Sequence, residues 1–222
     1  MRPVPPKIAT KVMVAADLIA ERGLDGTKIE EIAGVTGIRK ATLYYHFEGK
    51  EGILSFIFGV VLDALGRAVE SAVHSPGSAM DRLHRVVQGH LDVFATYPRA
   101  ARALHFDLGR AARLPEIDDR TRAAYIDAVA GLFKAGAEDG SIGKILNPQI
   151  SAVALLAATS TAAIHVTVMD GDDDVRKVAQ VISELILDGL SRGRCAERGS
   201  PTETSETPPS EKGEAPCALP LL

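Results

Sequence analysis

Apolar residues recur at helical spacing through most of the first 190 residues, and no other feature constrains the fold as strongly. The clearest run keeps the 3.6-residue period of an amphipathic helix, and its members are Ile53, Ile57, Val60, Val61, Ala64, Leu65, Ala68 and Val69. Prolines stand where further helices would begin, because a helix start leaves unpaired the N–H that proline lacks; they are Pro98, Pro115 and Pro148. Strand signals are scarce, so the sequence predicts an all-α fold of about nine helices.

Composition fits a soluble globular chain and argues against several other classes. Hydrophobic residues make up 46% and charged residues 24% of the 222 positions, enough to bury a substantial core. The formal net charge of −4 argues against a chain that is polybasic as a whole. Cys195 and Cys217 give neither a disulfide framework nor a CxxC zinc motif. Because residues 1–10 lack the apolar segment of a secretion signal, we expect a cytoplasmic location.

One stretch is apolar enough to raise the question of a membrane span. Residues 145–169 contain no Asp, Glu, Lys or Arg, and about 20 apolar residues can cross a bilayer. Several polar residues interrupt the stretch, and its bulk is alanine rather than leucine. We therefore expect a buried helix there and no membrane partner.

Composition and charge divide the chain into three parts. We expect an N-terminal domain over residues 5–65, a larger helical domain over 66–192 and a disordered tail over 193–222, where Ser, Pro, Thr, Glu and Gly dominate. The first 50 residues hold eight Lys or Arg against six Asp or Glu, net +2, and the remainder holds 17 against 23, net −6. An anionic partner is therefore favoured at the N-terminal end.

The basic N-terminal block contains a candidate DNA-binding unit. Thr27 followed by Glu30 predicts the capped start of a short helix, and Gly37 predicts a turn before a second short helix. Two such helices, braced by a preceding helix, form a helix-turn-helix over about residues 28–47. Four residues would pack inward at the helix crossing: Ile32, Ala33, Ile38 and Leu43.

The outward face of the second short helix has side chains suited to a DNA major groove. They are Arg39, Lys40, Thr42, Tyr44 and Tyr45. Cations and hydroxyl groups bind phosphate oxygens, Arg binds guanine edges, and aromatic rings contact thymine methyl groups and sugars. Lys50 and the backbone amides near Thr27 are placed to bind flanking phosphates. The alternative is packing in the core, which we favour for Leu43 and Phe47.

The same residues resemble the DNA-binding domain of the TetR family of bacterial transcriptional regulators. The matching positions are Ala16, Ile19, Gly23, Thr27, Ile32, Ala33, Gly37, Ile38, residues 40–47, Lys50, Glu51 and Leu54. The resemblance implies a DNA-binding repressor whose larger all-helical C-terminal domain dimerises and binds a small effector. It also implies a phosphate contact at Thr27 and DNA contacts at Thr42, Tyr44, Tyr45, His46 and Lys50.

Two positions in this match have more than one interpretation. Arg39 stands where the family often has a Ser or Thr helix cap, which makes Arg39 a candidate reader of a base edge. His46 precedes Phe47, and its side chain either contacts DNA or caps the helix.

The larger part of the sequence has no enzyme motif: it contains no GxSxG, P-loop, GxGxxG or HExxH pattern. We therefore expect no catalytic residues, no metal site and no cofactor. His84 and His90 lie six residues apart, on opposite sides of a helix, and we interpret both as solvated surface. Aromatic and polar residues on apolar helices predict an effector pocket, with core packing as the alternative. They are Phe94, Tyr97, His105, Phe106, Tyr125, Phe133, Thr161 and His165.

The last two predicted helices have the composition of a dimer interface. The first is rich in alanine, which permits close helix approach, and the second carries the apolar stripe Val178, Ile182, Leu185 and Ile186.

Four arginines of the larger predicted domain suit an anionic effector, such as an acyl-thioester of a cofactor. They are Arg99, Arg102, Arg110 and Arg113. We expect a homodimer that represses from a pseudo-palindromic operator until a small-molecule effector releases it. The alternative is a helical small-molecule or lipid-binding protein, or an enzyme, that uses the C-terminal cavity.

Overall fold

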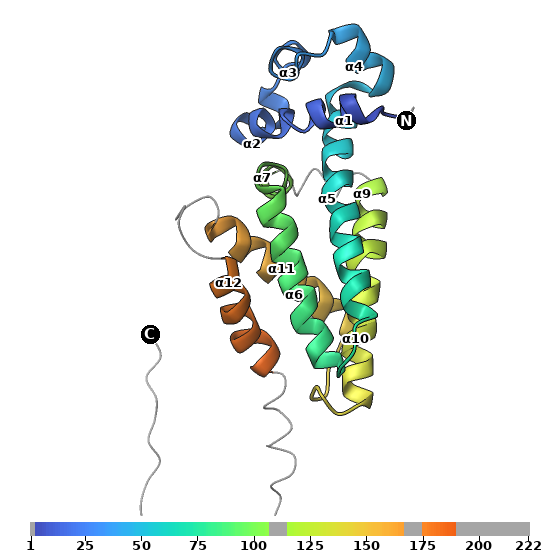
Figure 1. Cartoon of the computed structure of the whole chain (residues 1–222), viewed down its shortest axis with the longest axis vertical. Coiled ribbons are helices and arrows are strands. Elements are labelled where there is room, and N and C mark those ends of the chain that lie inside the picture. Colours follow the sequence, from blue (N-terminus) through green and yellow to red (C-terminus); the bar gives the residue numbers. More distant parts are fainter. Residues whose placement is uncertain (1–2, 107–114, 167–174, 190–222) are drawn as a thin grey trace, which may run out of the picture.

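The computed structural model describes residues 3–106, 115–166 and 175–189, and every regular element within these ranges is a helix (Figure 1). In chain order they are α1 (Pro6–Val12), α2 (Ala15–Gly26), α3 (Ile29–Thr36), α4 (Lys40–His46), α5 (Gly49–Val73), α6 (Ala79–Thr96), α7 (Pro98–Phe106), α9 (Pro115–Thr121), the π-helical turn η1 (Arg122–Ile126), α10 (Asp127–Glu138), α11 (Pro148–His165), α12 (Val175–Ile182) and the π-helical turn η3 (Ser183–Leu187). The predicted all-α class is confirmed. The expected tail, residues 193–222, lies outside the described ranges.

The first four helices form a small bundle at one end of an elongated helical body (Figure 1). Its core is apolar and fully closed, with Ile19, Ile32 and Leu43 each at most 1% exposed. The predicted first helix is divided between α1 and α2, and α2 is broken at Gly23, whose φ of 68° is in the left-handed region. Glycine adopts that conformation without the strain that a side chain would add. This explains why a glycine at position 23 interrupts the helix.

Proline and capping residues predict most helix starts correctly and misplace one of them by a single residue. α7, α9 and α11 begin at the predicted prolines, and the hydroxyl of Ser78 accepts the N–H of Asp81 at the start of α6. The expected cap of α3 is wrong. Lys28, not Thr27, precedes the helix, and its backbone N–H donates to Glu31 Oε2 at 2.8 Å.

The long helix α5 connects the small bundle to the larger helical domain (Figure 1). It runs through residue 65, so the expected domain boundary lies inside one continuous helix. The guanidinium of Arg120 on α9 donates to the Gly59 carbonyl at 3.1 Å and to Asp63 Oδ1 at 2.6 Å. These contacts hold α9 against the middle of α5.

α5 is also the one described helix that is long and apolar enough to cross a membrane. Half of its most apolar window is buried inside the fold, as in the core helix of a globular protein. The uncharged stretch 145–169, for which we considered a span, contains α11 instead; there Leu155 and Ala163 pack in the core while Val153 is half exposed. Burial of one face of α11 is typical of a helix that packs on the core of a globular protein.

Candidate nucleic-acid interface and effector cavity

The turn between α3 and α4 sets the direction of the second helix. Gly37 ends α3 in the left-handed conformation, with φ 62° and ψ 27°, and two residues later α4 begins. Ile32, Ile38 and Leu43 are at most 5% exposed, and Ala33 packs beside them, so the predicted inward face of the helix-turn-helix is confirmed. Burial of Phe47, 2% exposed, fixes the end of α4 against α5.

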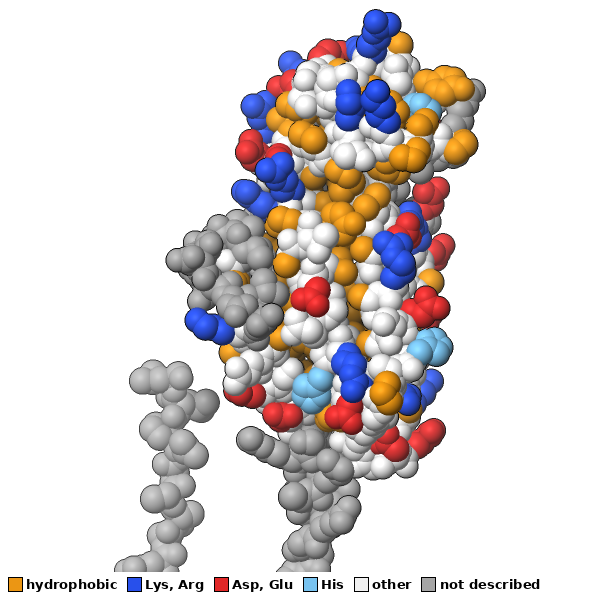
Figure 2. All heavy atoms as spheres, in the orientation of Figure 1, with side chains coloured by type: hydrophobic (Ala, Val, Ile, Leu, Met, Phe, Trp, Pro, Cys, Tyr) orange, Lys and Arg blue, Asp and Glu red, His pale blue; other side chains and the backbone are white. Residues whose placement is uncertain are grey.

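The opposite face of α4 is open to solvent. Tyr44 is 54% and Tyr45 is 59% exposed, unusual values for large aromatic side chains. Arg39 and Lys40 are exposed at the start of the helix, and Thr42 is half-buried. Figure 2 shows further Lys and Arg side chains distributed over this end of the molecule. Two exposed rings beside cations form a surface complementary to phosphates and base edges.

Lys40 has partners within the helix-turn-helix itself. Its ammonium forms an ion pair with Glu30 of α3 and lies 5.8 Å from the centre of the Tyr44 ring. The hydrogen bond from Lys40 lowers the pKa of the Glu30 carboxyl and raises the pKa of Lys40. This pair braces α3 against α4 and places a carboxylate next to the predicted DNA-binding face.

Thr27 and Lys50 lie together where the end of α2 meets the start of α5. The Thr27 side chain has no exposed surface, and its hydroxyl donates to the Gly23 carbonyl at 2.8 Å. Lys50 Nζ donates to the carbonyls of Leu24 at 2.7 Å and Thr27 at 3.0 Å. Both side chains are engaged with backbone oxygens in this structure, so their contact with phosphate stays a prediction.

His46 is half-buried at the end of α4. Its ring stands edge-on to Tyr45, with the ring centres 4.9 Å apart. The residue that follows the helix is Phe47, whose backbone N–H donates to the Leu43 carbonyl. The described contacts of His46 are therefore with the aromatic surface of α4.

A cavity of about 350 Å³ opens between the helices of the larger domain. It is lined mainly by apolar side chains from α5, α6, α7, α9 and α11: Val61, Leu62, Leu65, Phe94, Ala101, Leu104, Ile117, Asp118, Thr121, Val153, Leu156, Ala157, Ser160, Thr161 and Ile164. Apolar walls with a few polar groups, in a volume of about 300 to 1,000 Å³, are typical of small-ligand sites. Of the residues predicted for an effector pocket, Phe94 and Thr161 lie in this wall.

The other predicted effector residues lie elsewhere. Tyr125 and Phe133 are at most 1% exposed and pack in the core, as the alternative interpretation had it. Tyr97 faces a smaller hollow beside Met13, and exposed His165 is absent from the cavity wall. The side chains of His105 and Phe106 lie outside the described part of the chain, as do those of Arg110 and Arg113.

The interpretation of His90 as solvated surface is wrong. His90 is fully buried, 0% exposed, and its Nε2 lies 3.1 Å from the hydroxyl oxygen of Ser160 in the cavity wall. Burial lowers the pKa of His90 to about 3. The signal that sequence reasoning missed is its spacing: His90 follows Val86 and Val87 and precedes Phe94 on the apolar face of α6.

Comparison with known proteins agrees with this architecture. The family described as "Bacterial regulatory proteins, tetR family" matches residues 12–55, and "Tetracyclin repressor-like, C-terminal domain" matches residues 76–190. The transcriptional repressor KstR2 of Rhodococcus jostii (strain RHA1) is 30% identical over 192 residues, which cover 80% of this chain and 88% of that protein.

Two solved structures have the same fold at lower identity. The fatty acid degradation regulator FadR of Bacillus halodurans is 20% identical with a TM-score of 0.72, covering 85% of this chain and 98% of that one. FadR of Bacillus subtilis, solved in complex with stearoyl-CoA, is 19% identical with a TM-score of 0.69, covering 82% and 98%. From the helix-turn-helix to the C-terminal helices, the chain belongs to the TetR family of bacterial regulatory proteins.

Proposed function

We propose that this chain is a transcriptional repressor that reads its operator with α4 and leaves it when a small apolar molecule enters the cavity. The observation that carries the proposal is the exposure of Tyr44 and Tyr45 on a helix whose other face is locked into the core. A helix-turn-helix presents its second helix to the major groove in this way. The residues proposed to contact DNA are Arg39, Lys40, Thr42, Tyr44, Tyr45, His46 and Lys50; Thr27, which was predicted as a phosphate contact, has no exposed surface in this structure.

The composition of the cavity wall supports an effector with a large apolar part. Most of the lining side chains are aliphatic, and Phe94 adds an aromatic surface. FadR of Bacillus subtilis, which shares the fold, was solved with stearoyl-CoA, a molecule with a long apolar chain. The proposed class for this chain is therefore an apolar acyl or similar hydrocarbon compound.

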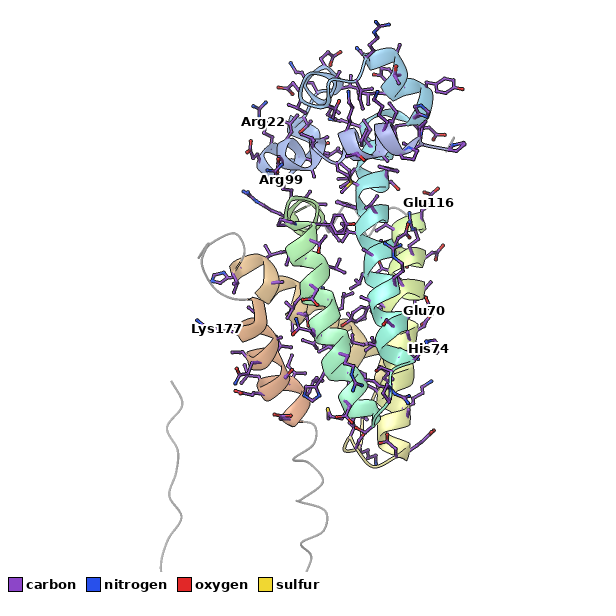
Figure 3. The ribbon with its side chains drawn as sticks, viewed as in Figure 1. Arg22, Glu70, His74, Arg99, Glu116 and Lys177 are labelled. Atoms are coloured by element: carbon purple, nitrogen blue, oxygen red, sulfur yellow. The ribbon has the colours of Figure 1, made fainter. Side chains whose placement is uncertain are left out.

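α7 is the element proposed to couple the cavity to the DNA-binding unit. Ala101 and Leu104 line the cavity, whereas Arg99 on the same helix pairs with Asp17 of α2 at 2.9 Å. Figure 3 shows Arg99 where α7 lies next to the N-terminal bundle. A ligand that binds better to one position of α7 favours the corresponding position of α2, with a coupling of about 1 to 3 kcal/mol.

A homodimer formed through α11, α12 and η3 is proposed because these elements expose apolar side chains. Ile150 and Val153 on α11 are 66% and 50% exposed, and Val181 and Leu185 are 51% and 74% exposed. The exposed stripe differs from the expected one, because Val178 and Ile182 are 7% exposed and pack within their own protomer. Two-fold pairing of this face would present two copies of α4 to a pseudo-palindromic operator.

The test is selection of a duplex from a random-sequence library, followed by affinity measurements at several salt concentrations. Wild type should bind one sequence class with a steep salt dependence, and Tyr44→Ala should lose most of that affinity. For Arg39→Ala the loss of binding free energy should be about 1 to 3 kcal/mol at one base position.

The effector part of the proposal is tested with stearoyl-CoA as a probe, which should weaken binding of the protein to the selected duplex. A chain that binds lipid but no duplex would instead be the helical carrier or enzyme of the alternative reading.

A further inference from the structure

One polar position in the cavity wall is built differently from the others. Ser160 lines the cavity, and its hydroxyl oxygen lies 3.1 Å from Nε2 of the fully buried His90. The hydroxyl of Thr121, by contrast, donates to the Ile117 carbonyl within its own helix. Asp118, 59% exposed at its side chain, and Thr161 are both open to solvent. Ser160 is therefore the lining residue whose hydroxyl contacts a buried imidazole on the side away from the cavity.

Aromatic packing fixes the imidazole in place. The His90 ring stands edge-on to Phe94, which lines the cavity, with ring centres 4.7 Å apart. On another side it stands edge-on to Tyr125, at 5.5 Å. Neither ring offers a charge, and within the described residues Nδ1 of His90 has no hydrogen-bond partner. The contact with Ser160 is thus the polar interaction that orients His90.

The charge state of His90 determines what Ser160 can offer a ligand. Burial lowers the pKa of His90 to about 3, so the ring is neutral near pH 7, with one N–H and one bare nitrogen. If Nδ1 held the hydrogen, a buried donor would be left unpaired, which is rarer than an unsatisfied acceptor. Assigning hydrogens from this network gives an Nε2–H group that donates to Ser160. The Ser160 hydroxyl then keeps its own hydrogen as a donor.

We propose that the cavity recognises an apolar ligand that carries a hydrogen-bond acceptor, a carbonyl oxygen, placed against the Ser160 hydroxyl. His90 is the positioning residue that holds this hydroxyl in its donor orientation. Ketones, esters and thioesters share the required acceptor on an apolar skeleton, whereas a plain hydrocarbon lacks it. The inference rests on the proposed effector function of the cavity and specifies its ligand.

The test compares two probes of the same shape, butyrophenone and butylbenzene, which differ by a carbonyl in place of a methylene. Methyl NMR titration of the lining Leu and Val residues gives both dissociation constants and reports whether the probe occupies the cavity. The ketone preference is the dissociation constant of butylbenzene divided by that of butyrophenone. It should be about 2- to 12-fold larger in wild type than in Ser160→Ala. Comparing ratios removes the difference in hydrophobicity between the probes.

Variants of His90 test its positioning role. His90→Gln keeps an N–H donor near the place of Nε2 and should retain most of the ketone preference, whereas His90→Phe should lose it. Long-range ¹⁵N NMR of the wild-type protein, which needs no substitution, should show a neutral Nε2–H imidazole. A neutral Nδ1–H imidazole would overturn the proposal.

The remaining outcomes separate this proposal from the effector function. If both probes shift the lining methyl groups but the ratio is the same in wild type and Ser160→Ala, the acceptor requirement is wrong and the cavity remains a ligand site. If neither probe shifts them, both the effector function of the cavity and the acceptor requirement fail.

Discussion

At the scale of single residues, Lys50 holds the end of α2 in place. Its ammonium donates to three backbone carbonyls, those of Leu24, Asp25 and Thr27, at 2.7 to 3.2 Å. Replacing it with methionine keeps the apolar stem but leaves these oxygens without their charged donor. We expect Lys50→Met to lower the free energy of unfolding by about 1 to 3 kcal/mol, measured by urea denaturation.

The control for this variant is Lys7→Met, an exposed position on α1, which should change the free energy of unfolding by less than about 0.5 kcal/mol. If Lys50→Met unfolded like wild type, the three carbonyl contacts would not stabilise the end of α2, and weaker DNA binding by this variant would then reflect loss of the proposed phosphate contact alone.

His90 gives the stability of the protein a dependence on pH. Its pKa is lowered from 6.5 to about 3 in the folded chain, so between these values the unfolded chain binds a proton that the folded chain excludes. The free energy of unfolding therefore decreases as the pH falls below 6.5, with a slope that approaches about 1.4 kcal/mol per pH unit. His90→Gln should lose stability less steeply in urea titrations down to about pH 4.5. Equal slopes for the two proteins would contradict this prediction.

Sequence spacing predicted which side chains share a helix face, but not what covers that face. Leu43 and Tyr44 are adjacent and were separated correctly into a buried and an exposed residue, because the period of α4 places them on different sides. The spacing of His90 from Val87 and Phe94 places it on the apolar face of α6, but the residues that cover it there, Ser160 and Tyr125, lie far along the chain. No local pattern encodes such contacts.

At the scale of elements, two glycines of α10 differ in what surrounds them. A Cβ at Gly131 would meet nothing within 4 Å, whereas at Gly136 it would lie 2.3 Å from Cδ1 and 3.1 Å from Cβ of Ile142, which is buried. Alanine favours a helix over glycine by about 0.5 to 1 kcal/mol. Thermal unfolding should show Gly131→Ala stabilised by that amount and Gly136→Ala destabilised by about 1 to 3 kcal/mol. Equal effects would mean that Ile142 moves away freely.

The ion pair between α3 and α4 predicts a change in DNA affinity. Glu30 pairs with the Lys40 ammonium beside the proposed DNA-binding face, and this pairing competes with any contact between Lys40 and phosphate. Glu30→Gln should therefore tighten DNA binding and steepen the slope of log K against log salt by about 0.9, the contribution of one phosphate contact. Glu138→Gln, at the end of α10, makes the same change in net charge and should leave the slope as it is. An unchanged slope in Glu30→Gln would place Lys40 away from phosphate.

Most helices and their starts were predictable from apolar periodicity and proline. The starts of α7, α9 and α11 were predictable from proline alone, because proline lacks an N–H and the first N–H groups of a helix have no partner within it. The cap of α3 was misplaced by one residue, because several polar side chains can satisfy a helix end. The Thr27 hydroxyl instead donates to the Gly23 carbonyl, four residues earlier in the chain. The cavity depends on how five helices pack, which periodicity does not specify.

At the scale of the whole molecule, exposed apolar residues predict assembly. Leu185 is 74% exposed on η3, and Leu185→Glu places a charge in the proposed two-fold interface. The variant should sediment as a folded monomer and lose DNA binding at concentrations where wild type is saturated, because two linked half-sites are needed. Val35→Glu, at a 49% exposed position on α3, should remain a dimer. A dimeric Leu185→Glu would remove this face from the interface.

The uninterrupted course of α5 has a mechanical consequence. With 25 residues rising 1.5 Å each, the helix is about 37 Å long and extends from the turn after α4 to the far end of the larger domain. At this length, a tilt of about 5° at one end would displace the other end by about 3 Å, close to the 3.4 Å step between neighbouring base pairs. A tilt of that size would be enough to shift the proposed DNA-binding helix α4 by about one base pair along an operator.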